Sequence, residues 1–359
     1  MDLVEQLKRF NERRAATDPI GVNSRVLLVD AMNTYIRNFC AVPTMNDTGE
    51  HVGGVTGFLK SVGQAARLYV PTRIICVFDG AGGSQRRRKL FEGYKDNRRP
   101  MEHLNRTYNF KDKEAEQAAL KWQMHLLVEL LEHLPVNTLA IDNIEADDAI
   151  AYLVQLVREA GGKSTILSTD KDFLQLVDKS CEVFNPVKKK LYTPELVVEE
   201  YGIHPKNFLL ARIVEGDKSD NIPGVNGVGE ATLLKLFPYL KDAIPADIDT
   251  LLESCKRELT VETGKRVKKT KTPVACLKLS QAKDDGIIER NRQLMDLANV
   301  DISGTAKIKI GDALRDTPHA LNKYDLTKKM NEFRLLSAFG NYDEWLLTSW
   351  VPLTRYCKE

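Results

Sequence analysis

The sequence predicts an α/β fold in which a central sheet is flanked by helices and a helical lobe follows. Short runs of aliphatic residues such as VLLVD and RIICVFD are continuously apolar, which is typical of parallel strands buried on both faces. Segments with helical periodicity separate these runs. After Tyr201 the chain becomes helical and rich in loops, so we expect a boundary near residue 200.

The elements of the first half follow in order. Residues 1–24 are expected to form an N-terminal extension, with a short amphipathic helix and a loose segment. A buried strand is predicted at 25–30, a helix from about Asn33, a second helix from about residue 54 and a second strand at 73–79. Residues 80–112 carry many arginines and lysines with little apolar periodicity, so they predict an excursion from the core.

A long helix at 113–134 returns the chain to the core. Strands at 138–142 and 164–169 flank the helix DDAIAYLVQLVREAGG, and CEVFN and KKLYT predict a hairpin. The resulting domains are the extension (1–24), an α/β core (25–200) with the excursion at about 82–112, a helical lobe (201–300) and a C-terminal helical region (301–359).

Composition points to a globular protein. The 359 residues are 43% hydrophobic and 28% charged, which is ordinary for soluble domains. The six cysteines form no CxxC pair, so we expect free, mostly buried thiols in a reducing compartment. The first residues are too charged for a signal peptide and no apolar run reaches eighteen residues, which predicts a cytoplasmic protein.

Carboxylates stand where predicted strands and helices end, and this is the most informative pattern. Loops at the carboxyl ends of parallel strands form the binding crevice of an α/β sheet, so the acids are expected to meet there. Two carboxylates about 5 Å apart oppose each other by roughly 3 kcal/mol, so cations must hold them together. The candidates are Asp30, Asp79, Glu145, Asp147, Asp148, Asp170, Asp172, Asp217 and Asp220.

Oxygen ligands without Cys or His select Mg²⁺ or Mn²⁺ over Zn²⁺. Two such ions about 4 Å apart would serve an in-line displacement at phosphorus, with water as the nucleophile. Setting the nine acids aside leaves 52 basic against 41 acidic residues, a net +11, which suits a polyanionic substrate. The alternative for any single acid is a helix N-cap, and for the basic surface a random spread of lysines.

Two further segments predict contacts with DNA. In NIPGVNGVGEATLLKLF, Gly224, Gly227 and Gly229 permit positive φ and leave backbone amides open, and the next helix supplies Thr232 and Lys235; an ordinary helix–helix turn is the alternative. In the excursion, YKDNR places Lys95 and Arg98 three residues apart, on one face if it is helical. These cations would act at the scissile phosphate and Tyr94 would stack on a base; a disordered basic loop is the alternative.

Together these motifs resemble the 5′-nuclease, or flap endonuclease, superfamily, and in particular its phage-type 5′–3′ exonucleases such as the T-even-type phage RNase H. The resemblance covers about residues 25–300 and rests on VDAMNTYIR, VFDG, YKDNR, IEADDAIA, STDKDFLQL and GDKSDNIPGVNGVGEATLL. It implies a PIN-like core, a helical arch over the site and a helix–three-turn–helix lobe that binds duplex DNA.

The resemblance also implies roles for individual residues. The first metal ion would contact Asp30, Asp79, Glu145, Asp147 and Asp148, and the second would contact Asp170, Asp172, Asp217 and Asp220, partly through water. Lys95 and Arg98 would be catalytic, and K⁺ would bind at the glycine turn. Many relatives have an aromatic residue six positions after the first aspartate; here that position is Ile36, beside Tyr35.

These observations predict a structure-specific 5′–3′ nuclease that removes 5′ flaps and RNA primers from duplex DNA with two Mg²⁺ or Mn²⁺ ions. We expect a monomer that acts on branched or nicked duplexes and RNA–DNA hybrids, with a single-strand-binding or clamp protein as a possible partner. The alternatives are a PIN-type ribonuclease, which leaves GVNGVG unexplained, a branched-DNA-binding protein without catalysis, which has no need of nine acids, and a helix-hairpin-helix glycosylase.

Overall fold

A parallel sheet forms the centre of the computed structural model, which describes residues 21–97, 103–262 and 271–358, without the side chains of 256–262 and 271–273. Its order is β3-β2-β1-β4-β5-β6, and only β6 runs antiparallel, in the predicted hairpin with β5. Most of the predicted extension, residues 1–20, lies outside the described residues. The strands are β1 (Arg25–Asp30), β2 (Arg73–Phe78), β3 (Asn137–Ala140), β4 (Lys163–Leu167), β5 (Cys181–Asn185) and β6 (Lys190–Tyr192).

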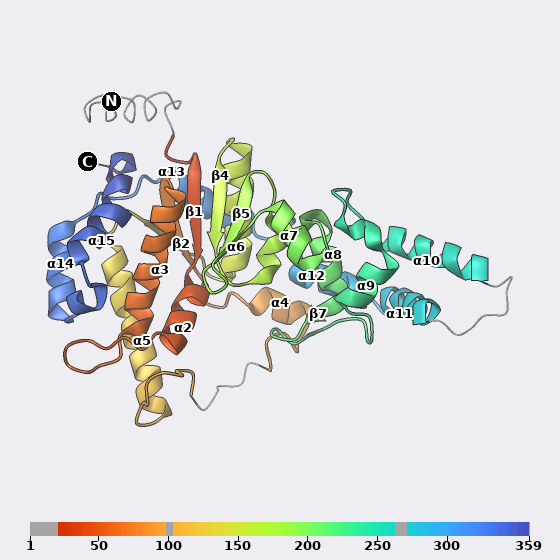
Figure 1. Cartoon of the computed structure of the whole chain (residues 1–359), viewed down its shortest axis with the longest axis horizontal. Coiled ribbons are helices and arrows are strands. Elements are labelled where there is room, and N and C mark those ends of the chain that lie inside the picture. The colour runs from red at the N-terminus through yellow and green to blue at the C-terminus, as the bar shows by residue number, and fades with distance from the viewer. Residues whose placement is uncertain (1–20, 98–102, 263–270, 359) are drawn as a thin grey trace, which may run out of the picture.

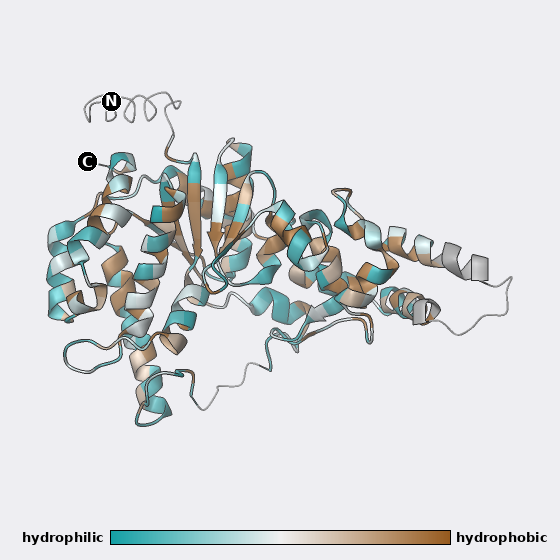
Figure 2. Ribbon diagram, in the orientation of Figure 1, coloured by the Kyte–Doolittle hydropathy of each residue, from teal (hydrophilic) through white to brown (hydrophobic). Residues whose placement is uncertain are grey.

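Strands β1 and β2 are buried on both faces, as their uninterrupted apolar runs predict. Alternate residues of β1 enter different cores: Val26 and Leu28 join one apolar cluster, and Leu27 and Val29 join the other. Figure 2 shows these strands as apolar ribbons between mixed helices. The centre of the sheet therefore has two hydrophobic layers, whereas the edge strand β3 keeps Thr138 and Ala140 exposed.

Helices from both ends of the chain cover one face. Apolar residues of α3, α5, α14 and α15 share a cluster with Leu27 and Val29, and these helices lie together on one side of the sheet in Figure 1. The C-terminal helices α14 and α15 therefore pack on the core. The helices are α2 (Ala31–Ala41), α3 (Gly53–Tyr69), α5 (Lys113–Leu131), α14 (Lys323–Glu332) and α15 (Tyr342–Ser349).

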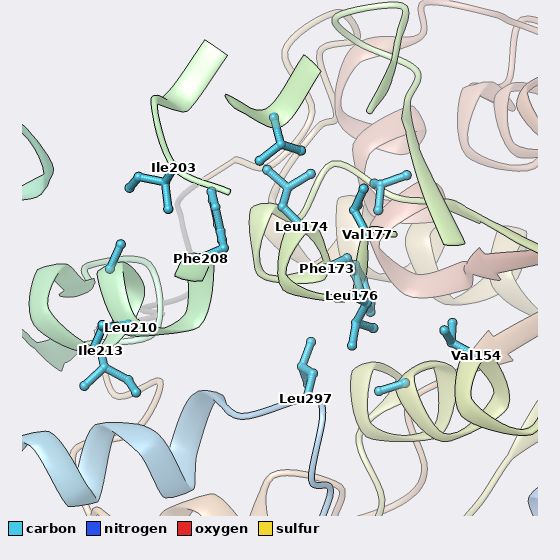
Figure 3. Packing of buried hydrophobic residues seen from close by; sticks show 14 of the residues in the cluster. Val154, Phe173, Leu174, Leu176, Val177, Ile203, Phe208, Leu210, Ile213 and Leu297 are labelled. Atoms are coloured by element: carbon cyan, nitrogen blue, oxygen red, sulfur yellow. The ribbon is translucent and has the colours of Figure 1, made fainter. Parts of the chain in front are cut away.

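The other face carries α6 and continues into the helical half of the molecule. The buried stripe of α6 consists of four apolar residues that are each at most 1% exposed: Ile150, Leu153, Val154 and Val157. Figure 3 shows the same cluster extending past Val154 and Phe173 to Phe208 and Ile213. Near residue 200 the chain therefore changes from strands to helices, but the residues on both sides of this point share one continuous apolar cluster. They do not form two separate cores.

The remaining elements are short or lie in the helical half. Helices α10 and α11 extend away from the sheet at the far end of the molecule (Figure 1). The helices are α4 (Gln85–Leu90), α6 (Ala146–Glu159), α7 (Pro194–Tyr201), α8 (Pro205–Glu215), α9 (Glu230–Leu236), α10 (Ile248–Glu262), α11 (Lys271–Asp284), α12 (Ile287–Met295) and α13 (Gly304–Arg315). Single-turn helices are η1 (Lys171–Leu176), η2 (Pro238–Lys241), η3 (Leu336–Phe339) and η4 (Val351–Tyr356), and a two-stranded ribbon joins β7 (Gly216–Asp217) to β8 (Ile222–Pro223).

Two expectations need correction. Cys255 of α10 and Cys276 of α11 form a disulfide, so the prediction that all six cysteines are free is wrong for this pair; a separation of 21 residues gives no pairing signal before the helices pack. The excursion contains one short helix, α4, among its described residues, rather than an extended helical arch. None of the described helices is long and apolar enough to cross a bilayer.

Candidate active site

The site begins at the carboxyl end of β1, at the point where the strand order reverses between β1 and β4. Asp30 is the last residue of β1 and caps α2 by accepting a hydrogen bond from the Asn33 backbone N–H at 3.2 Å. Its second oxygen accepts from the Ser168 hydroxyl, just beyond β4, at 2.9 Å. The N-cap alternative is thus true of Asp30, and the same side chain also faces the crevice.

The next acids gather at the start of α6. Asp79 follows β2, and its carboxylate accepts from the Ala146 backbone N–H at 2.8 Å. Ala146 is the first residue of α6, so this bond ties the end of β2 to the turn that carries Glu145, Asp147 and Asp148. Negative charge in the first turn of a helix is stabilised by the helix dipole, although burial raises the pKa of Asp147 well above its ordinary value.

The remaining four acids lie in two segments: Asp170 and Asp172 follow β4, and Asp217 and Asp220 follow α8. Asp170 caps η1 by accepting from the Asp172 backbone N–H at 2.8 Å. The buried guanidinium of Arg212, on α8, donates to Asp172 at 2.6 Å and also pairs with Asp217. Asp220 accepts from the Tyr94 hydroxyl at 3.2 Å. One arginine therefore joins acids that lie 45 residues apart in the chain.

The two acidic groups lie close enough to influence each other. Burial, together with the charge of Asp79, raises the pKa of Asp30 to about 6. Loss of solvent and the charge of Asp172, with smaller effects of Asp30 and Asp220, raise the pKa of Asp170 to about 7 although this residue keeps an exposed surface. Asp30 therefore lies near both Asp79 and Asp170, two acids that are distant from it in the chain.

The basic segment reaches the same place. The Lys95 ammonium pairs with Glu145, and its charge acts on Asp30. Its backbone N–H donates to the Asp220 carbonyl at 2.8 Å. Lys95 has φ 60°, so the predicted helical face with Arg98 does not form at Lys95, and Arg98 itself lies outside the described residues.

Tyr94 occupies a different position from the one predicted. Its residue is 2% exposed, and its hydroxyl donates toward Glu145 and Asp220 at 3.2–3.4 Å. The expected stacking on a base is not open to this ring as it lies, because the ring belongs to a small apolar cluster with Ile222 and Leu294. Tyr35, the aromatic beside Ile36, is also fully buried.

Arg87 is a second basic residue that the sequence did not single out. It lies on α4, its side chain is 2% exposed, and it pairs with Glu145, Asp147 and Asp148. Burial opposes its charge, but these three acids hold the pKa of Arg87 well above its ordinary value. Three consecutive arginines at 86–88 were the available signal, but which of them turns inward depends on tertiary packing.

The glycine turn lies between α8 and α9, as predicted. Only Gly227 of its three glycines has positive φ, at 74°, so the expectation of positive φ is wrong for Gly224 and Gly229. Gly224 is required for a different reason: a Cβ there would lie 2.1 Å from the Glu215 carbonyl oxygen. Gly229 caps α9, and its surroundings are open. Thr232 and Lys235 follow on α9, with Lys235 exposed.

The acids have the chemistry of a site for hard divalent cations. Their ligand atoms are carboxylate oxygens, and the raised pKa values of Asp30 and Asp170 show that the present partners do not fully offset their charges. Across the described ranges, no three His, Cys, Asp or Glu side chains are arranged to hold an ion. Arg87, Lys95 and Arg212 occupy carboxylate oxygens instead, so ion binding requires side-chain rearrangement.

Comparison with known proteins places this architecture in a family. Residues 25–202 match the model of the 5′-3′ exonuclease N-terminal, resolvase-like domain. The chain is 34% identical to a 5′-3′ exonuclease of Buchnera aphidicola over 217 residues, which are 60% of this chain and 70% of that protein. It is 33% identical to a 5′-3′ exonuclease of Bacillus subtilis over 65% of this chain and 74% of the relative.

A solved structure shares the fold. The flap endonuclease of bacteriophage T5, crystallised as a complex with DNA and metal ions, aligns with a TM-score of 0.58 at 19% identity, over 86% of this chain and 97% of the T5 chain. The chain belongs to the 5′-3′ exonuclease family of metal-dependent nucleases that hydrolyse phosphodiester bonds.

Proposed function

We propose that this chain is a structure-specific 5′–3′ nuclease that removes 5′ flaps and RNA primers from duplex DNA by two-metal hydrolysis. The observation that carries the proposal is the convergence of two acidic groups at one sheet edge beside Lys95. Membership of the 5′-3′ exonuclease family supports the polarity of cleavage.

The residues of this chain would divide the work as follows. Asp30, Asp79, Glu145 and Asp147 would hold one Mg²⁺ or Mn²⁺ ion, and Asp170, Asp172, Asp217 and Asp220 the other. Asp148, the fifth acid expected at the first ion, is paired with Arg87. Ions bound in this way supply an activated water and offset the charge that develops at phosphorus. Lys95, which already touches Glu145, would orient and neutralise the scissile phosphate.

Residues 201–300 would bind the duplex. Lys235 and backbone amides of the glycine turn would contact phosphates, which positions DNA without reading its sequence. The short ribbon β7–β8 carries Asp217 and lies directly before the glycine turn, so a duplex held by the turn would be fixed relative to the acids. Three expectations stay predictions: Arg98 as a catalytic cation, K⁺ at the glycine turn, and a clamp or single-strand-binding protein as a partner.

Cleavage mapping tests the proposal. Labelled 5′-flap, nicked and RNA-primed duplexes are incubated with the protein, with and without Mg²⁺, beside an RNA stem-loop. We expect Mg²⁺-dependent cleavage near the branch, with a 5′-phosphate at the newly formed end. Preference for the stem-loop would favour a PIN-type ribonuclease, and tight flap binding without any cleavage would favour a DNA-binding protein.

A further inference from the structure

The contacts of Arg87 separate one acid from the other members of its group. Both oxygens of Asp148 accept from this guanidinium, one from Nη2 at 2.8 Å and the other from Nη1 at 3.1 Å. Such a two-point pairing of a planar guanidinium with a carboxylate is among the strongest ion pairs in proteins. The Asp148 side chain is only 3% exposed, whereas that of Asp147 is 32% exposed.

Neighbouring positions at the start of α6 thus face different surroundings. Successive residues of a helix point about 100° apart. Asp147 reaches only Nη1 of Arg87, through one oxygen at 3.3 Å, whereas Asp148 is bonded to both terminal nitrogens. Arg86 also approaches Asp148, at 3.4 Å. Asp148 is therefore directed toward the arginines of α4, and Asp147 is the more open of the two.

Arg87 also connects three segments that surround the site. Its Nε donates to the Leu294 carbonyl of α12 at 2.8 Å, and its Nη1 pairs with Glu145. Glu145 is held from the other side by Lys95. Although burial opposes ionisation, Arg87 and Lys95 keep the pKa of Glu145 below its ordinary value.

We infer that Asp148 is the anchor of Arg87 and not a metal ligand, and that Arg87 is a positioning residue that holds Glu145 in place before an ion binds. This inference rests on the proposed function for the identity of the ion, but the pairing itself involves only residues of this chain. A buried charge left without its partner is strongly destabilising. Loss of either Arg87 or Asp148 should therefore lower the stability of the folded protein.

The first measurement uses no metal and no DNA. Melting temperatures are measured in EDTA for Arg87→Met, Asp148→Ala, the double variant and the surface control Arg88→Met, whose side chain is 46% exposed. We expect Arg87→Met to lower the melting temperature by about 5 °C or more, the two single effects to be non-additive, and Arg88→Met to have little effect. Additive losses, or equal behaviour of Arg87→Met and Arg88→Met, would overturn the pairing.

The second measurement is Mn²⁺ binding by calorimetry on the full chain without DNA. Asp148→Asn keeps an acceptor for Arg87, so its affinity should stay within about threefold of the wild type, while Arg87→Met should lose about tenfold, as removal of groups that orient metal ligands does. Asp147→Asn should lose at least as much as Arg87→Met. Equal losses in Asp148→Asn and Asp147→Asn would overturn the inference.

Two provisions keep the outcome clear. If Arg87→Met does not fold, Arg87→Lys retains the charge but not the two-point pairing, and it should still weaken Mn²⁺ binding; wild-type affinity in that variant would count against the inference. Failure of the wild type to bind Mn²⁺ would contradict the proposed function, whereas the double-variant comparison in EDTA would still decide whether Arg87 and Asp148 act as a pair.

Discussion

Lys95 is the cation whose position connects the basic segment to the acids. Its side chain is 19% exposed and pairs with Glu145, and its backbone N–H donates a hydrogen bond to the Asp220 carbonyl. Because a fixed cation at a transferring phosphate acts mainly on the transition state, Lys95→Ala should lower the cleavage rate by about 10²-fold or more with a modest loss of flap affinity.

Single-turnover cleavage and equilibrium binding of the same flap check this prediction. Lys89→Ala is the matched control, because this substitution removes the same charge from an exposed position on α4. Equal losses of rate and affinity in Lys95→Ala would reassign Lys95 to simple binding.

The raised pKa values of two acids predict how pH affects the metal-free protein. The pKa values of Asp30 and Asp170 rise from 3.8 to about 6 and about 7 on folding. Between pH 3.8 and about 7, the folded protein therefore binds more protons than the unfolded chain. The stability that this extra protonation contributes at low pH is lost as the pH rises through about 6 to 7. Divalent ions bind the ionised carboxylates, so their stabilising effect should grow over the same range.

Thermal unfolding at pH 5 and pH 8, in EDTA and in Mg²⁺, measures both effects. The increase in melting temperature on adding Mg²⁺ should be several degrees larger at pH 8, and Asp30→Asn/Asp170→Asn should reduce that difference. An equal Mg²⁺ effect at the two pH values in the wild type would argue against this account of the acids.

At the scale of elements, the α8–turn–α9 unit depends on one close backbone approach. Gly224 lies against the Glu215 carbonyl, so Gly224→Ala should cost about 1–3 kcal/mol of unfolding free energy. Gly229→Ala is the matched control: its φ is −99° and a Cβ meets nothing within 4 Å, so its effect should stay within about 0.5 kcal/mol.

Urea unfolding and binding of a nicked duplex distinguish the two alanine variants. Gly224→Ala should also weaken duplex binding. The new Cβ would collide with the Glu215 carbonyl, and the backbone movement that relieves this contact displaces the turn relative to α8. If both variants unfolded at the same urea concentration, the close approach at Gly224 would have no energetic importance.

The elements that could be predicted from the sequence are those with a strong local pattern. The apolar runs of β1 and β2, the stripe of α6 and the hairpin β5–β6 follow from periodicity and turn residues. Asp30, Asp79 and Asp170 follow from their position after strands. Long side chains are different: Arg87 and Arg212 find their acids only after α4 and α8 pack, so nothing local identified them.

On the scale of the whole molecule, the strand order brings the acids together. The chain moves from β3 on one side of β1 to β4 on the other, and the reversal leaves Asp30 facing the loop after β4. This order was not predictable from the apolar pattern, although the meeting of strand ends was. The helical half then adds Asp217 and Asp220 through α8 and the β7–β8 ribbon.

The central claim is that these acids form one metal site that cleaves DNA. The most direct measurement compares Mg²⁺-dependent cleavage of a 5′ flap by the wild type, Asp79→Asn and Asp170→Asn, with flap binding measured in parallel. The account predicts that both variants lose cleavage and keep nearly wild-type binding. Unchanged turnover by either purified variant would contradict it.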